Sequence, residues 1–293
     1  MFSNRVAWTR GPGCLDLATT LSDESPIAVT GDLRSACIEH RVEFLVSKKF
    51  TGFDLVPMIV PSDLDLGAID AVTAAVAEGP HSPLAVEVAA RIGRSLGIPV
   101  SAATAYHTNE DRSAATDLLE LLSQSVDVAV EKIAIASNQA SAIVESLTPT
   151  TLLVIGAPGG SWFQRQLYGP GHKLVVASPA GAVLVRSGPR RCFMDTHEPE
   201  NVAMSVHLTV REAKRMMTDP VAPVVDDGRL VGVVRKRVVF ETEDSLAMGD
   251  VMEPPVSVDA DEPTQAAAEL AEFLDGGPIP VVDQDRLVGV IRL

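Results

Sequence analysis

The chain has 293 residues, which is too long for one ordinary hydrophobic core and predicts about two domains. Its 39 acidic and 24 basic residues give a net charge of −15, which disfavours nucleic acid as a partner because phosphate backbones are repelled. Hydrophobic residues make up 46% of the chain and aromatic residues only 4%, a mixture typical of parallel sheets covered by helices.

The absence of targeting signals and the cysteine pattern both predict a cytoplasmic protein. The first residues lack the apolar stretch of a signal peptide, and no run approaches the ~20 apolar residues that cross a bilayer. We therefore expect no membrane partner. Cys14, Cys37 and Cys192 are far apart and odd in number, which disfavours a disulfide framework and fits a reducing compartment.

Residues 1–67 are expected to form an α/β extension of unassigned type. A helix is expected at residues 32–40. Prolines at positions 57 and 61 place the last strand of this segment at an edge or an end of a sheet. The segment either extends the following domain or is a degenerate third module, and the sequence leaves both open. Strands are expected at residues 27–30, 42–46 and 55–60.

Residues 68–187 alternate strands with helices, which predicts crossover connections and a parallel sheet with both faces covered. The clearest helix is expected at residues 83–96, with Gly97 as its stop, and two more at residues 113–126 and 141–147. Strands are expected at residues 71–77, 98–106, 128–136, 151–155 and 181–186.

A glycine-rich stretch follows the strand at residues 151–155. Glycines between a strand and a helix let the backbone approach a phosphate, and the helix N-terminus then holds the negative charge. A parallel sheet also places its ligands at the carboxyl ends of the strands. The glycines of this stretch and of the residues that follow it are Gly156, Gly159, Gly160, Gly169 and Gly171.

The spacing of these glycines resembles a universal stress protein domain. Gly156-x-x-Gly159, then nine residues and Gly169, follows TLLVIG and precedes SPAGAVLVR, and the resemblance covers residues 68–187. It implies a Rossmann-like fold and a site where these five glycines and Glu78 bind ATP or another adenine nucleotide. Two departures bear on that site. Pro170 replaces the family's Ser or Thr, and Glu78 matches the family's first-strand Asp only after a one-residue shift. The alternative is a glycine loop that only makes a turn.

A repeat occupies the C-terminal third of the chain, after a predicted linker at residues 188–199. Pro223–Arg235 reads PVVDDGRLVGVVR and Pro280–Arg292 reads PVVDQDRLVGVIR, with ten of thirteen positions identical. The two copies, residues 200–240 and 247–293, are each expected to fold as β-α-β-β. One such unit is too small to bury its own apolar faces, so the copies should pack together.

Each copy also has a helix-start signal and a hairpin, and the whole pattern resembles a tandem pair of CBS domains. Thr209 is followed three residues later by Glu212, and in the second copy Asp261 precedes a helix with Pro263 in its first turn. Strand, helix, then "PVVD-x-x-x-LVGVV" is the arrangement that carries the resemblance. It implies a regulatory module that binds adenine nucleotides.

The family's ribose clamp, however, is missing from both copies. In nucleotide-binding members the second hairpin strand runs into T-x-x-D, whose Asp holds the ribose. Here Arg235 stands for the Thr and Val238 for the Asp, and the second copy ends just after Arg292. We therefore expect a structural module without family-like affinity for adenosine ligands. Arg235 and Arg292 are either solvated or contact phosphates in place of the clamp.

These patterns together predict a non-enzymatic regulator that senses adenine nucleotides through one or both modules. The alternative is a ligand-free adaptor that keeps both folds for homodimer and partner-protein contacts, and a weak ATPase is a third possibility. The histidines form no metal spacing, and no catalytic residue stands out. Val183–Val185 and the helix around Met216 and Met217 are the candidate surfaces for association, and the alternative for each is a place in the core.

Overall fold

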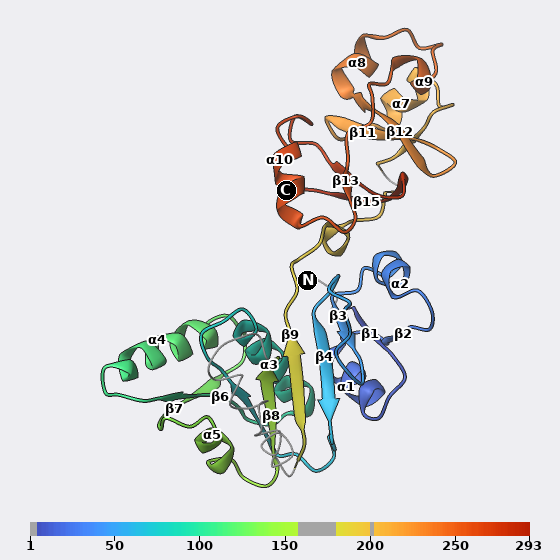
Figure 1. Cartoon of the computed structure of the whole chain (residues 1–293). Helices are drawn as coiled ribbons and strands as arrows, with labels where there is room; N and C mark the ends of the chain where they lie inside the picture. Colours follow the sequence, from blue (N-terminus) through green and yellow to red (C-terminus); the bar gives the residue numbers. More distant parts are fainter. Residues whose placement is uncertain (1–4, 158–179, 200–201) are drawn as a thin grey trace. The chain divides into compact units, whose positions relative to one another are not determined.

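The computed structural model shows two compact units (Figure 1). The first unit comprises Met1–Leu33 and Val42–Gly188, and the second comprises Arg34–Arg41 and Pro189–Leu293. No helix in the described part of the chain is long and apolar enough to span a membrane. The structure describes residues 5–157, 180–199 and 202–293.

The first unit is built on one sheet, which has nine strands among the described residues. The strands are β1 (Val6–Trp8), β2 (Ile27–Ala28), β3 (Phe44–Val46), β4 (Met58–Ser62), β5 (Ala71–Ala75), β6 (Val100–Tyr106), β7 (Val130–Ala136), β8 (Thr151–Gly156) and β9 (Ala182–Arg186). Their order is β2-β1-β3-β4-β9-β8-β5-β6-β7. All neighbours run parallel except β4 and β9. The predicted parallel α/β class is confirmed.

Strands β5 to β9 form a doubly wound sheet in the order β9-β8-β5-β6-β7, so the winding reverses between β5 and β8. The four strands before Ala71 join the same sheet because β4 pairs with β9 from Met58 to Ser62. This pairing decides between the two alternatives for Val183–Val185. Val183–Val185 lies inside the sheet between β4 and β8, so it is not a free edge for association.

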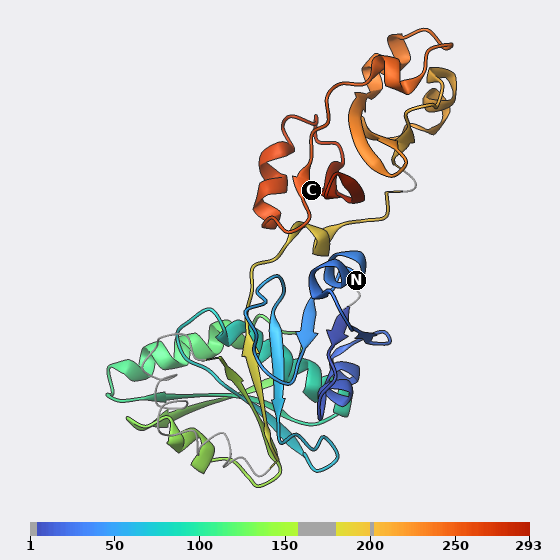
Figure 2. The same cartoon turned by 45° about the vertical axis from the view of Figure 1, so that its right-hand side comes forward.

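The helices cover both faces of this sheet (Figures 1 and 2). They are α1 (Cys14–Leu21), α3 (Ser82–Leu96), α4 (Asp111–Ser123) and α5 (Ser141–Glu145), and α2 (Leu33–Glu39) lies where the two units divide the chain. Residues of α1, α3 and α4 form one core, while Ile143 of α5 belongs to a smaller core on the other face. Pro83 in the first turn of α3 and Gly97 at φ +68° fix its two ends as the sequence predicts.

The second unit contains the two predicted copies on one sheet. Copy one has β10 (Met204–Ser205), α7 (Val210–Met216), β11 (Val221–Asp226), β12 (Arg229–Arg235), α8 (Lys236–Glu241) and α9 (Met248–Val251). Copy two has β13 (Val258–Asp259), α10 (Thr264–Leu270), β14 (Ile279–Asp283) and β15 (Arg286–Ile291). The strand order is β10-β11-β12-β15-β14-β13. At the centre, β12 pairs antiparallel with β15, with Arg229 opposite Arg286. The predicted capping box of Thr209 and Glu212 begins α7.

The two copies exchange short lead-in segments, which are residues 191–197 before copy one and residues 252–255 before copy two. His197, which precedes copy one, bridges to Val290 of copy two through paired backbone hydrogen bonds of 2.8 and 3.1 Å. Glu253, which precedes copy two, bridges in the same way to Val233 of copy one, at 2.8 and 3.1 Å. Each copy is therefore completed by chain that belongs to the other.

The exchange explains the glycine in the repeated LVGV sequence. A Cβ on Gly232 would lie 2.6 Å from the carbonyl oxygen of Glu253, and a Cβ on Gly289 would lie 2.5 Å from Cβ of Thr196. Both distances are too short for any side chain. The repeated glycine is thus needed where the exchanged lead-in segment crosses each strand.

Candidate functional site

Two of the predicted site residues lie at the carboxyl edge of the first sheet. Gly156 is the last residue of β8, and Glu78 is exposed in the turn between β5 and α3. Because β5 and β8 are parallel neighbours at the reversal of the winding, both residues occupy the edge where such sheets bind ligands. The other predicted glycines, with Pro170, lie outside the described residues: Gly159, Gly160, Gly169 and Gly171.

Gly156 has a packing role in addition to any ligand role. A Cβ at this position would lie 2.8 Å from Cβ of His81, which sits at the start of α3. A side chain at Gly156 would therefore push against the turn that carries Glu78. The glycine is required here by the close approach of β8 to that turn, whether or not a phosphate binds.

His81 ties this turn to the end of β9. Its Nδ1 accepts the backbone N–H of Ser187 at 3.1 Å and lies 2.6 Å from the Ser187 hydroxyl oxygen. Burial, with a smaller contribution from the positive charge of Arg186, lowers the pKa of His81 below its ordinary value. The imidazole is therefore neutral near pH 7, with Nδ1 as the acceptor.

Ser82 closes the same turn. His81 is the N-cap residue and Ser82 is the first residue of the helix, so the Ser82 hydroxyl does not cap it. The Ser82 hydroxyl instead donates to the carbonyl of Ala77 at 2.6 Å and accepts its N–H at 3.1 Å. Both polar groups of Ala77 are satisfied, which holds the backbone before Glu78 in one conformation.

A cleft of about 260 Å³ opens beside Glu78, between the ends of β5 and β6 and the start of α4. Thr104, His107 and Asp111 contribute to its lining. Hydrogen bonds from the hydroxyl and N–H of Thr108 lower the pKa of Asp111, which stays ionised. Two carboxylates make this cleft better suited to hydroxyl or amine groups than to phosphate.

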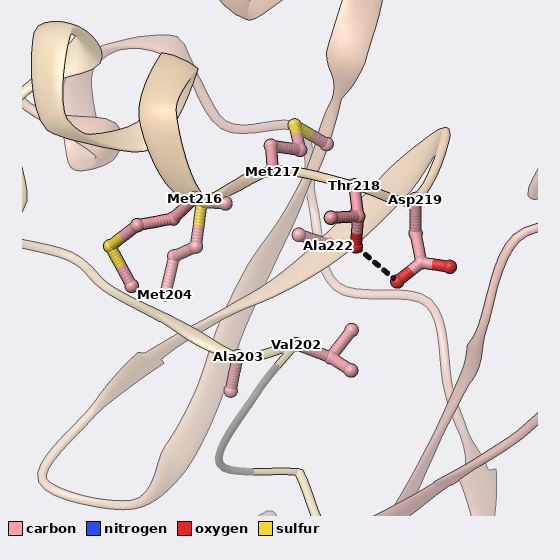
Figure 3. A pocket seen from close by; sticks show the side chains of 8 residues that line it. All are labelled: Val202, Ala203, Met204, Met216, Met217, Thr218, Asp219 and Ala222. Carbon is pink, nitrogen blue, oxygen red and sulfur yellow. Dashed lines mark hydrogen bonds between the residues drawn. The ribbon is translucent and has the colours of Figure 1, made fainter.

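A second candidate site lies in copy one of the second unit (Figure 3). Its volume is only about 10 Å³, the space of about one water. The walls are mostly apolar, and three flexible methionines contribute to them. The lining residues come from the segment at β10, the end of α7 and the start of β11: Val202, Ala203, Met204, Met216, Met217, Thr218, Asp219 and Ala222.

Asp219 supplies the charged group of this pocket. Its carboxylate accepts a hydrogen bond from the Thr218 hydroxyl at 3.3 Å, drawn as the dashed line in Figure 3. It also accepts a bond of 2.9 Å from the guanidinium of Arg292, which comes from the end of copy two. The Arg292 side chain is 48% exposed, and this is its one ion pair among the described residues.

Arg235, the counterpart of Arg292 in copy one, is held far more firmly. Its Nε contacts both carboxylate oxygens of Glu253, at 3.0 and 3.1 Å, and its Nη atoms reach Asp275 and the carbonyl of Phe273. The bonds to Glu253 and then Asp275 raise its pKa above the ordinary value. The side chain is 18% exposed. The sequence left two alternatives for this arginine, a solvated side chain or a contact with phosphate. Neither applies to Arg235, because its guanidinium is bonded to carboxylates.

The sequence missed the carboxylates that meet these arginines. Asp219 and Asp275 both lie between the helix and the first hairpin strand of their copies, but the repeat alignment offsets them by one residue. That offset hides the correspondence from a comparison of the two copies. One signal in the sequence could have identified Asp219. It is an acidic residue just before the repeated PVVD strand, where it can meet the arginine that ends the hairpin of the other copy.

Cys192 follows Arg190 and Arg191 in the sequence, but these arginines do not activate its thiol. Its side chain is fully buried in a short 3₁₀ helix, Cys192–Asp195, packed on copy two. Burial first, and then the negative charge of Glu262, raise its pKa to about 11. Arg191 opposes this shift only weakly, so the thiol stays protonated.

Comparison with known proteins identifies the second unit. The CBS domain family model matches residues 195–242 and 248–293, so these residues form a tandem CBS pair. This match does not extend to the first unit, where the universal stress protein resemblance rests on the residues quoted for it. No curated protein matches the chain.

Solved structures match about a third of the chain. The cytosolic domain of the Mg²⁺ channel MgtE in complex with ATP is 29% identical over 35% of this chain and 46% of that one, with a TM-score of 0.32. CBSX2 in complex with AMP is 23% identical over 35% and 90%, with a TM-score of 0.30. A CBS domain pair/ACT domain protein from Thermotoga maritima is 21% identical over 35% and 89%, at 0.33. This chain spans less than half the length of the first of these.

Proposed function

We propose that this chain, with its C-terminal CBS pair, is a non-enzymatic regulatory protein that senses an adenine nucleotide at the pocket of copy one. The observation that carries the proposal is the pairing of Asp219 with Arg292 beside an apolar pocket. An adenine nucleotide needs an apolar slot for its base, an acceptor for its ribose hydroxyls and a cation for its phosphate. These three kinds of group adjoin one another here.

The pocket must open before a base can enter, because it now has room for about one water. Met216 is 53% exposed, so its side chain can swing outward at little cost. Met217 is 6% exposed and belongs to the core of copy one, so it stays as a fixed wall. The base then takes the space that the Met216 side chain leaves.

Asp219 and Arg292 then separate onto different parts of the ligand. The carboxylate of Asp219 accepts the ribose hydroxyls, and the guanidinium of Arg292 turns to the phosphate. This replaces a contact between the two copies with two contacts to the nucleotide. Ligand binding therefore changes how copy two is held by copy one, which is the regulatory signal.

Calorimetric titration of the full chain with adenosine, AMP, ADP and ATP tests this proposal. We expect Asp219→Asn to weaken binding of all four about tenfold or more, because a charge-assisted hydrogen bond is lost. Arg292→Ala should weaken AMP, ADP and ATP but not adenosine. Asp227→Asn, at an exposed turn position of the same copy, is the control and should bind as the parent does.

The second candidate function is a ligand-free adaptor, and the occupied arginines favour it. Both Arg235 and Arg292 already have carboxylate partners, and the pocket is closed. If no nucleotide gives a binding heat with the folded chain, the sensor proposal fails and the adaptor remains. Measurable release of phosphate from ATP by the purified chain would contradict the non-enzymatic part of both proposals.

The first unit offers a separate place for a nucleotide, at the edge that carries Glu78 and Gly156. Its cleft has acceptors for ribose hydroxyls in the carboxylates of Glu78 and Asp111. The phosphate-binding part of this proposal depends on the glycines outside the described residues. If nucleotide affinity survives Asp219→Asn unchanged and falls in Glu78→Gln, the sensing site belongs to the first unit.

A further inference from the structure

The two sheets have four edge strands among the described residues, and three of them are very short. β2, β10 and β13 have two residues each. β7 has seven residues, pairs with β6 along its whole length and, within the described chain, pairs with no other strand. Natural sheets avoid long open edges because their free N–H and C=O groups accept another strand. β7 is therefore the exception that needs an explanation.

The residues of β7 divide into a charged half and an aliphatic half. Glu131 and Lys132 lie in the first half, and Lys132 forms an ion pair with Glu120 of α4, which places its side chain on the α4 face of the sheet. Ile133 and Ile135 therefore project to the other face, where they pack against the core that contains α5. Both isoleucines remain half-buried, and Ala134 between them is exposed.

We propose that β7 is the interface with a second copy of this chain, paired antiparallel with β7 of that copy and centred on Ala134. A two-fold axis perpendicular to the sheet keeps equivalent faces on the same side, so opposite residues project to the same face. Ile133 then lies opposite Ile135 of the second copy, and the reverse pair repeats this contact. Both half-buried isoleucines gain an apolar neighbour.

The charges of β7 disfavour registers centred on its first half, and only a centre at Ala134 places Ile133 opposite Ile135. A pair centred on Glu131 would place two carboxylates opposite each other, and one centred on Lys132 would place two ammonium groups together. Centring on Ala134 puts Lys132 opposite Ala136 of the second copy, so no like charges face each other. The same pattern favours a second copy over a foreign strand, because the aliphatic half is complementary to itself when reversed.

A single cysteine on the axis tests the interface directly. In the proposed register Ala134 lies opposite itself, and opposite Cα atoms of antiparallel strands are about 4.5–5.5 Å apart, within the range of a disulfide. Ala134→Cys should therefore give a covalent dimer on mild oxidation. The native Cys14, Cys37 and Cys192 are buried and do not interfere. Ala28→Cys, at an exposed position on the opposite edge strand β2, is the matched control and should stay uncrosslinked.

Light scattering of the unmodified chain and of Ala134→Lys completes the test. The parent should be a dimer at micromolar concentration, and association should strengthen with salt because each chain carries a charge of −15. Ala134→Lys should raise the dimer dissociation constant about tenfold or more, with the melting temperature of the isolated protomer unchanged. A monomeric parent would overturn the proposal. So would a dimer that survives Ala134→Lys and forms no disulfide in Ala134→Cys, which would place the contact elsewhere.

Discussion

Cys192 shows how a single buried residue sets a pH limit on the fold. Its thiol has a pKa near 9 when exposed and about 11 in the folded chain, because burial and Glu262 disfavour the thiolate. The unfolded chain therefore loses this proton first as the pH rises. The contribution of the protonated thiol to the free energy of unfolding is therefore fully present below pH 9. It is lost progressively between pH 9 and about 11.

Replacing this thiol should remove that part of the pH dependence. We expect the free energy of unfolding of the parent to fall by about 1 kcal/mol more than that of Cys192→Ala between pH 8 and pH 10. Urea unfolding at a series of pH values measures how the free energy of unfolding of each protein changes with pH. The variant is compared with its own value at pH 8, so any packing loss cancels. Parallel slopes for the two proteins would contradict the assignment to Cys192.

At the scale of elements, equivalent arginines at the ends of β12 and β15 differ in burial and in the number of their partners. Arg235 is 18% exposed and contacts two carboxylates and a carbonyl, while Arg292 is 48% exposed and, among the described residues, forms an ion pair only with Asp219. The first arrangement holds the copies together. The second leaves one arginine that can exchange its partner for a ligand.

This inequality predicts different stability costs for two otherwise identical substitutions. Arg235→Ala should destabilise the second unit by about 1–3 kcal/mol, because it removes a mostly buried side chain that bonds Glu253, Asp275 and the Phe273 carbonyl. Arg292→Ala should cost less than about 1 kcal/mol, as expected for an exposed ion pair. Arg237→Ala, at an exposed position of α8, is the control and should be neutral. Thermal unfolding measures all three, and equal losses for Arg235 and Arg292 would contradict the distinction.

The sequence predicts elements well where hydrophobic periodicity is strong. The helix expected at residues 83–96 is found at Ser82–Leu96, and both hairpins of the repeat are where the identical segments place them. The strand Val6–Trp8 and the helix Cys14–Leu21 were missed, because a three-residue strand between polar flanks has no readable period. The sequence also cannot show that β4 pairs with β9, since that contact joins residues more than a hundred positions apart.

The candidate site is less predictable than the fold, for a related reason. The LVGV glycines and the two arginines are visible as repeated residues, but their partners come from the other copy. Asp219 meets Arg292 only because the paired copies bring the end of copy two beside the segment between α7 and β11 of copy one. A motif search within one copy therefore identifies half of each contact.

At the scale of the whole molecule, the exchanged lead-in segments make the second unit indivisible. His197 pairs with Val290 and Glu253 with Val233, so a fragment holding one copy lacks a strand-edge partner. We expect residues 189–293 to fold cooperatively as an isolated fragment. Residues 189–246 and 247–293 should each be unfolded when expressed alone. Circular dichroism with urea titration compares the three fragments, and cooperative unfolding of either single copy would contradict this expectation.

The same exchange bears on how such a chain could arise. A single β-α-β-β unit that lends its lead-in segment to a neighbour and receives one in return is already half of a closed, two-fold assembly. Joining the end of one such unit to the start of the next by gene duplication would create no new contact surface. It would only turn an association between ancestral subunits into a connection within one polypeptide, and the two copies could then diverge, as Arg235 and Arg292 have in their surroundings.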